Sequence, residues 1–309
     1  MLYAYRSTIE LTQQIKDVDS TNEKLLLLRL PRIDEHKHCW EATIKRLFFL
    51  AKLLKLDITT ETVFQILKPQ GKKYLKTDER KLLNYHKVFS WLRYEWYMNP
   101  APINSQTIEE LFQRNNLTDY RIDHRNIDNF LRFIQIKTEH PLNQAALCYY
   151  LIPEYIKFPE HSKVILSHLT TYLVLYKNGY DFRDLLILEE ATYQKLFKIK
   201  PKVDLNRTNL AKLIEHFTFY LNTYLEKLII KIEQGRFDLN YPPAFFSLTR
   251  RQQQILELFN NPEVLVNNRL VQQQFKVSQI TASRDLSKLA SLGLILTAGS
   301  GRSVYYLKI

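Results

Sequence analysis

The stretch VSQITASRDLSKLASL at residues 277–292 decides the fold expected for the last part of this chain. On a helix, Ala282, Leu286 and Leu289 fall on one face, at spacings of four and three residues. Ser278 precedes this pattern and is a residue type that caps helix N-termini. The stretch predicts a helix with one buried face, and its other side carries mostly polar residues: Ile280, Thr281, Arg284, Ser287, Lys288 and Ser291.

A glycine-tipped hairpin is predicted directly after this helix. Two strand-like runs, 294–297 and 303–309, flank the segment AGSGR. Two shorter helices precede the first one: RQQQILELF, capped by the Ser-Leu-Thr at 247–249, and RLVQQQF, capped by Asn267 or Asn268. Three short helices followed by a hairpin predict a winged helix-turn-helix.

The exposed face of the helix has the side chains that suit contact with duplex DNA. Ile280 has no packing role in this register, and a thymine methyl is one partner for it in the major groove. Arg302, at the tip of the wing, is expected to meet a phosphate or the minor groove. From residue 248 onward, eight basic and three acidic residues give 8 − 3 = +5. The predicted DNA-contacting residues are Ser278, Gln279, Ile280, Thr281, Ser283, Arg284, Lys288 and Arg302. The alternative is a winged helix that contacts only protein.

The composition is that of an ordinary globular protein. The chain has 309 residues, 45% hydrophobic and 25% charged, with a formal net charge of +12. This surplus fits a polyanionic partner, and it fits equally a lysine-rich composition with no functional meaning. Two cysteines form no framework or metal-like spacing, and no signal sequence or apolar run of about 20 residues is present. We therefore expect a cytoplasmic location, with no metal and no cofactor.

The first 235 residues predict nine or ten helices and no confident strand. Residues 1–32 read as a mixed segment in which Thr21 and Asn22 cap a short apolar run, whereas 183–198 read as one helix. The expected organisation is an N-terminal segment on the helical core (1–40), a helical domain (41–236), a linker (237–246) and a winged helix-turn-helix (247–309). The fold class is mainly α, with a β-hairpin wing.

Several stretches resemble the Fic family and the winged helix that many bacterial Fic proteins carry. LTRRQQQILELF, VSQITASRDLSKLASLGLI and GSGRSVYYL look like that winged helix. TDERKLLNYHKVFSWL, EHPLNQAALCYYLI and LTTYLVLYKNGYDFRDLLILEEATYQKLF resemble helices of the Fic domain. The likeness covers roughly residues 40–309 and implies a Fic-like helical domain.

The family's signature, His-Pro-Phe-x-Asp/Glu-Gly-Asn-Gly-Arg, has no counterpart here. The aligned stretch is KFPEHSKVI at 157–165, so Lys157 stands at the position of the catalytic histidine. A phosphate-binding nest needs a left-handed residue, normally glycine, yet no glycine lies between Gly71 and Gly179. The family's inhibitory motif is also absent from 51–58. The degenerate positions are Lys157, Glu160, His161, Ser162, Lys163 and Ile165. No catalytic residue is therefore predicted.

These observations favour a DNA-binding regulator on a degenerate Fic-like scaffold. Its expected partner is double-stranded DNA, with a second copy of the chain or another protein as further candidates. One alternative is a nucleotidyl or phosphate transferase with a non-standard site, which would use Lys157, Glu160, His161 and Lys163. His161 and His168 lie seven residues apart, too far along a helix to share one metal ion. We therefore expect His168 to be packed or hydrogen-bonded in the interior.

Overall fold

The computed structural model describes residues 5–67, 74–117, 121–136, 138–157, 160–194, 209–239, 248–259, 264–292, 294–299 and 304–308. The chain divides into two compact units. The first, here called the helical unit, consists of Met1–Arg29, Ala42–Val63 and Leu75–Arg236. The second, the C-terminal unit, consists of Leu30–Glu41, Phe64–Tyr74 and Phe237–Ile309.

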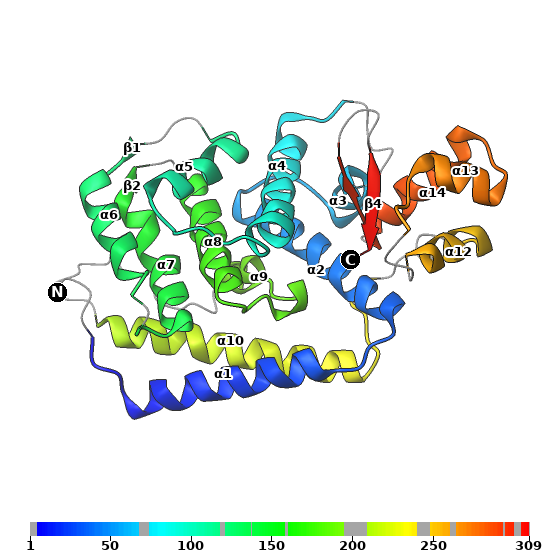
Figure 1. The fold of residues 1–309 in the computed structure, drawn as a ribbon. Helices are drawn as coiled ribbons and strands as arrows, with labels where there is room; N and C mark the ends of the chain where they lie inside the picture. Colours follow the sequence, from blue (N-terminus) through cyan, green and yellow to red (C-terminus); the bar gives the residue numbers. More distant parts are fainter. Residues whose placement is uncertain are drawn as a thin grey trace. The chain divides into compact units, whose positions relative to one another are not determined.

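Two long helices, α1 (Ile9–Leu27) and α10 (Leu210–Glu233), lie side by side in the helical unit (Figure 1). Polar contacts connect them along their length, including the hydrogen bond that the Thr21 hydroxyl donates to Asn222 Oδ1 at 2.9 Å. Helix α1 runs through the segment predicted as mixed, so the prediction that Thr21 and Asn22 cap a short run was wrong. Both residues lie within α1 instead, and their side chains are buried.

Helices α7 (Pro141–Tyr155) and α8 (Glu160–Lys177) pack against each other in the interior of this unit. Pro141 opens α7, as its fixed φ and missing N–H predict. Gly179 follows α8 with a φ of +80°, as expected for the residue after a helix C-terminus. The unit also contains α4 (Thr77–Trp91), the π-helix η1 (Leu92–Trp96), α5 (Ser105–Arg114), α6 (His124–Phe133) and α9 (Leu188–Tyr193). Helices α2 (Arg32–Leu53) and α3 (Thr60–Leu67) each contribute residues to both units.

The single helix predicted over 183–198 is wrong in its described part. A short turn, η2 (Phe182–Asp184), and α9 occupy residues 182–193, and residues 195–198 lie outside the described chain. All three residues of η2 have positive φ, from 48° to 61°. The Asp181 side chain accepts the N–H of Arg183, and the Arg183 guanidinium donates to the carbonyls of Leu25 and Leu28. These contacts hold a conformation that interrupts the helix.

A pair of two-residue strands also departs from the prediction of no confident strand. Strand β1 (Arg121–Ile122) pairs antiparallel with β2 (Ile156–Lys157). Strands this short have no sequence periodicity that could be recognised.

The C-terminal unit contains α12 (Arg250–Leu258), α13 (Asn268–Phe275), α14 (Gln279–Ser291) and the antiparallel strands β3 (Ile295–Ala298) and β4 (Tyr305–Lys308). The expected N-caps are confirmed: each of Thr249, Asn267 and Ser278 accepts a backbone N–H of its helix. The fold is therefore mainly α with a β-hairpin. The buried core of the C-terminal unit includes Ile255, Val266, Val271, Ala282, Leu286 and Leu289, and Trp40 packs against this core.

Candidate nucleic-acid interface

Helix α14 has one face that is buried and one that is open to solvent. Ala282, Leu286 and Leu289 are fully buried in the core of the C-terminal unit, as their spacing predicts. Ser278 caps the helix by accepting the N–H of Thr281 at 3.3 Å. On the opposite face, four residues at spacings of three, one and three form an exposed stripe along the helix: Ile280, Ser283, Arg284 and Ser287.

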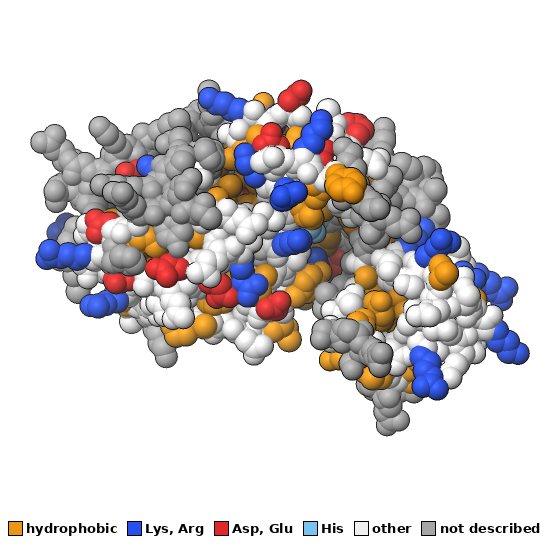
Figure 2. All heavy atoms as spheres, turned by 90° about the horizontal axis from the view of Figure 1, so that it is seen from above, with side chains coloured by type: hydrophobic (Ala, Val, Ile, Leu, Met, Phe, Trp, Pro, Cys, Tyr) orange, Lys and Arg blue, Asp and Glu red, His pale blue; other side chains and the backbone are white. Residues whose placement is uncertain are grey.

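The residues predicted to contact DNA fall into three groups. Ser278 and Gln279 are exposed, together with Ile280, Ser283 and Arg284 of the stripe. Thr281 and Lys288 are half-buried beside the stripe. Arg302 lies outside the described residues. Seven of the eight predicted residues are therefore in or directly before α14, with none fully buried. Figure 2 shows basic side chains on the surface of the part that holds α12–α14, on the right of the view.

Asp285 connects α14 to α12. Its carboxylate is only 4% exposed and accepts hydrogen bonds from Arg251 Nε at 2.6 Å and Gln252 Nε2 at 2.8 Å. Gln252 also accepts the N–H of Thr249 in a capping box, so the contact extends to the start of α12. Charge-assisted bonds to a buried carboxylate fix the position of α14 on its unit. Sequence reasoning counted Asp285 only as a negative charge. Its place on the buried face, three residues after Ala282 and four before Leu289, was the available signal.

The turn before α14 contains a lysine in a conformation that glycine usually adopts. Lys276 has a φ of 50° and a ψ of 46°, the left-handed region. The N–H of Val277 donates to the carbonyl of Gln272 at 3.2 Å, which is the six-to-one bond of a Schellman motif. Lys276 is exposed. Lys276 was not among the predicted DNA contacts, because a left-handed lysine has no signature in sequence.

The degenerate Fic positions lie around the start of α8. Ser162 and Ile165 are buried, with 4% and 5% of their surfaces exposed, and Lys163 is half-buried. Lys157 contributes its backbone to β2, and the side chains of Lys157, Glu160 and His161 lie outside the described part of the chain. Within that part, no group of three or more His, Cys, Asp or Glu residues is placed to hold a metal ion.

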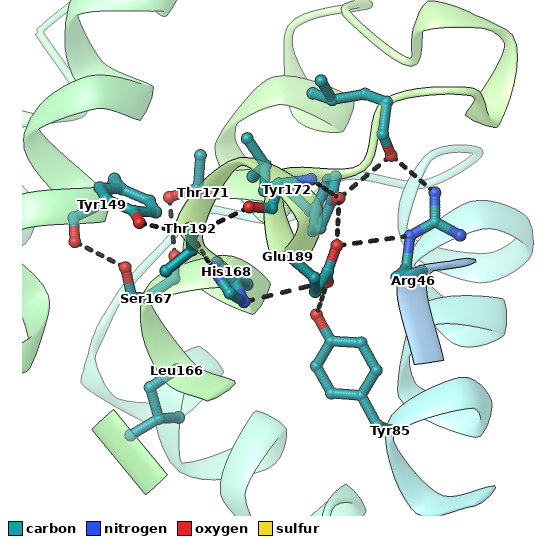
Figure 3. A network of polar contacts seen from close by, with 12 residues as sticks. Arg46, Tyr85, Tyr149, Leu166, Ser167, His168, Thr171, Tyr172, Glu189 and Thr192 are labelled. Carbon is teal, nitrogen blue, oxygen red and sulfur yellow. Dashed lines mark hydrogen bonds and ion pairs between the residues drawn. The ribbon is translucent and has the colours of Figure 1, made fainter. Parts of the chain in front are cut away.

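A buried polar network occupies the middle of the helical unit (Figure 3). The Glu189 carboxylate accepts hydrogen bonds from the hydroxyls of Tyr85 and Tyr172, the latter at 3.1 Å. Arg46 Nε lies 4.0 Å from this carboxylate, and Arg46 Nη2 donates to the carbonyl of Leu186 at 2.8 Å. Burial raises the pKa of Glu189, and the nearby guanidinium opposes that rise. Glu189 is fully buried, so its carboxylate offers no surface to a substrate.

His168 belongs to the same network and is fully buried, as the sequence analysis expected. Its Nε2 shares a hydrogen bond of 2.8 Å with the Thr192 hydroxyl, and its Nδ1 lies 3.9 Å from Glu189. Burial lowers the pKa of His168 to about 3, because the charged imidazolium is poorly solvated in the interior. The side chain is therefore neutral at physiological pH.

Stability is expected to fall in mild acid because of His168. The unfolded chain binds a proton at this residue near pH 6.5, whereas the folded chain does not until the pH approaches 3. Between these values the unfolded state holds more protons, so lowering the pH from 7 to 5 costs about 2 kcal/mol through this group. Urea unfolding at pH 7 and at pH 5 should show a smaller loss of unfolding free energy for His168→Gln than for the wild type.

The difference between the two proteins isolates His168, because other titrating groups remain in both. Glu189 is one of them, and its raised pKa acts in the opposite direction, by favouring proton uptake in the folded state. Equal losses of stability in the wild type and His168→Gln would contradict the prediction.

The C-terminal unit contains a helix-turn-helix domain: residues 251–304 match the DeoR-like helix-turn-helix domain. Over the whole chain, the fold is similar to that of a Fic family protein from Desulfovibrio desulfuricans G20, solved as a crystal structure. The TM-score is 0.56 at 12% sequence identity, and the match covers 99% of this chain and 97% of that one. The resemblance to a Fic fold with a C-terminal helix-turn-helix is thus confirmed. No curated protein matches the chain. Among the described helices, none is long and apolar enough to cross a bilayer.

Proposed function

We propose that this chain is a sequence-specific DNA-binding protein, with a regulatory role in transcription, built on a Fic-like fold without Fic catalysis. The observation that carries the proposal is the exposed stripe of α14 in a domain of the helix-turn-helix class. It presents hydroxyl and guanidinium groups that match the donor and acceptor pattern of the major groove, on a helix whose other face is buried.

The proposed absence of Fic catalysis rests on the residues at 157–165. Ser162 and Ile165, at positions where the family has glycine and arginine, are buried in α8. A serine and an isoleucine there supply neither the flexible backbone of a phosphate nest nor a fixed cation. The residues at these two positions support the proposal that the function of the protein depends on the C-terminal unit.

Duplex binding tests the proposal. The full chain is expected to bind double-stranded DNA, and the logarithm of its association constant should decrease linearly with the logarithm of the salt concentration. Selection from a library of random duplexes, followed by titration of the enriched and the starting sequences, measures both affinity and preference. If no duplex is bound in a salt-sensitive manner, the proposal is wrong.

Lys276→Gly is expected to change stability and DNA affinity in opposite directions. Glycine relieves the left-handed strain, which should raise the free energy of unfolding by about 0.5–1 kcal/mol. The lost ammonium, three residues before the start of α14, should weaken binding to all sequences. The salt slope should become less steep by about 0.9 if this lysine neutralises one phosphate. Urea unfolding and binding titrations at several salt concentrations measure these effects.

The matched control for this prediction is Lys55→Gly. Lys55 is also exposed, follows a helix and has a φ of 56°. The next residue, Leu56, donates to the carbonyl of Ala51 at 2.9 Å, the same six-to-one bond. This variant should gain similar stability without any change in DNA binding. Equal DNA affinities for Lys276→Gly and the wild type would exclude Lys276 as a phosphate contact.

A further inference from the structure

Ile280 is the one apolar member of the exposed stripe on α14. Its side chain is 64% exposed in the first turn of the helix, beside Gln279 and in line with Ser283 and Arg284. The core of the C-terminal unit is formed by residues on the opposite face, so Ile280 adds nothing to it. At the N-terminal end of this otherwise polar stripe, its aliphatic side chain is open to an incoming partner.

The chemistry of the major groove supplies one apolar feature, the C5 methyl group of thymine. A β-branched side chain such as isoleucine has a restricted χ1 in a helix, so Ile280 loses little entropy when it is fixed against a methyl group. Contact between the two removes apolar surface of both from water. Cytosine has no methyl at this position, so the contact also distinguishes the pyrimidines.

We propose that Ile280 is a specificity-determining residue that recognises the methyl group of a thymine, an inference that rests on the proposed DNA binding. Arg284 lies four residues further along the same stripe, which is about 6 Å along the helix axis. One base-pair step is about 3.4 Å. The thymine therefore lies within about two base pairs of the base that Arg284 contacts.

Substitution of thymine by deoxyuridine tests this inference, because the two nucleotides differ only by the methyl group. In a duplex selected by the wild-type chain, each thymine in turn is replaced by deoxyuridine. At one position of the site, the wild type should lose affinity about threefold to tenfold. Ile280→Ala should bind the thymine and deoxyuridine duplexes equally at that position. Its salt slope should equal that of the wild type, because isoleucine neutralises no phosphate.

Leu265→Ala is the matched control. Leu265 is another aliphatic residue of the C-terminal unit, 58% exposed, and it lies outside α14. This variant should keep the full sensitivity to deoxyuridine. If the wild type binds duplex DNA but shows no sensitivity to deoxyuridine, or if Ile280→Ala keeps that sensitivity, the inference is overturned and the proposed DNA binding stands. If no duplex is bound, the proposed function itself fails.

Discussion

Replacing Arg46 by methionine is expected to lower the free energy of unfolding by about 3–5 kcal/mol, the cost of leaving one partner of a buried ion pair uncompensated. Arg46 and Glu189 have side chains that are 3% and 0% exposed. The substitution also leaves the backbone carbonyls of Asp184 and Leu186 without the guanidinium that donates to them. Urea unfolding at pH 7 measures the loss.

Arg114→Met is the control for this substitution. Arg114 also lies over an aromatic ring, that of Trp91 at 4.4 Å, as Arg46 lies over Phe89 at 3.7 Å. Its ion pair with Glu110, however, is exposed. Exposed pairs contribute little, so this variant should lose less than about 1 kcal/mol. A second test is Arg46→Met combined with Glu189→Gln, which removes the buried charge and should recover part of the loss. Similar losses for the Arg46 and Arg114 variants would contradict the prediction.

Arg284→Ala is expected to reduce the preference for the selected sequence over random duplexes by about 5- to 150-fold, which corresponds to roughly 1–3 kcal/mol for a bidentate contact to guanine. Arg284 is exposed, so the variant should fold as stably as the wild type. Binding titrations with the selected duplex and with a scrambled one measure the preference.

Substitution of a second arginine distinguishes base recognition from phosphate contact. Arg269 is exposed near the start of α13, outside the stripe. Arg269→Ala should weaken binding to both duplexes by the same factor if it contacts DNA, and leave both unchanged if it does not. Arg302→Ala, at a position that the sequence predicts to be the tip of a wing, is expected to weaken binding to all sequences as well. If Arg284→Ala also weakens the two duplexes equally, Arg284 does not read bases.

The parts of the fold that could be predicted from sequence depend on local interactions. Ser278, Asn267 and Thr249 each cap a helix through a bond that spans three residues, so their role is visible in a short window. The apolar face of α14 was equally clear, because Ala282 and Leu286 lie one turn apart and pack into a single core.

The parts that could not be predicted depend on contacts between distant residues. Arg46 and Glu189 are 143 residues apart in sequence, and neither stands out in its own helix. The left-handed turn at η2 depends on Arg183 reaching the end of α1, more than 150 residues away. Helix α1 itself was missed because its buried leucines and valine recur every seven residues, at Leu11, Val18 and Leu25, among many polar neighbours. Seven residues are two turns, too sparse a pattern for a confident prediction.

The C-terminal unit consists of three segments that are far apart in the sequence, so the ribosome synthesises the parts of its core at different times. Trp40 is synthesised well before the core that it packs against, which includes Ile255 and residues beyond it. At typical translation rates, roughly 10–40 s separate the synthesis of these two side chains. Trp40 must remain without its final neighbours for that interval, a period in which an exposed indole is a natural target for chaperones. The helix-turn-helix can acquire its complete core only after its last core residues, up to Ile295, have been synthesised.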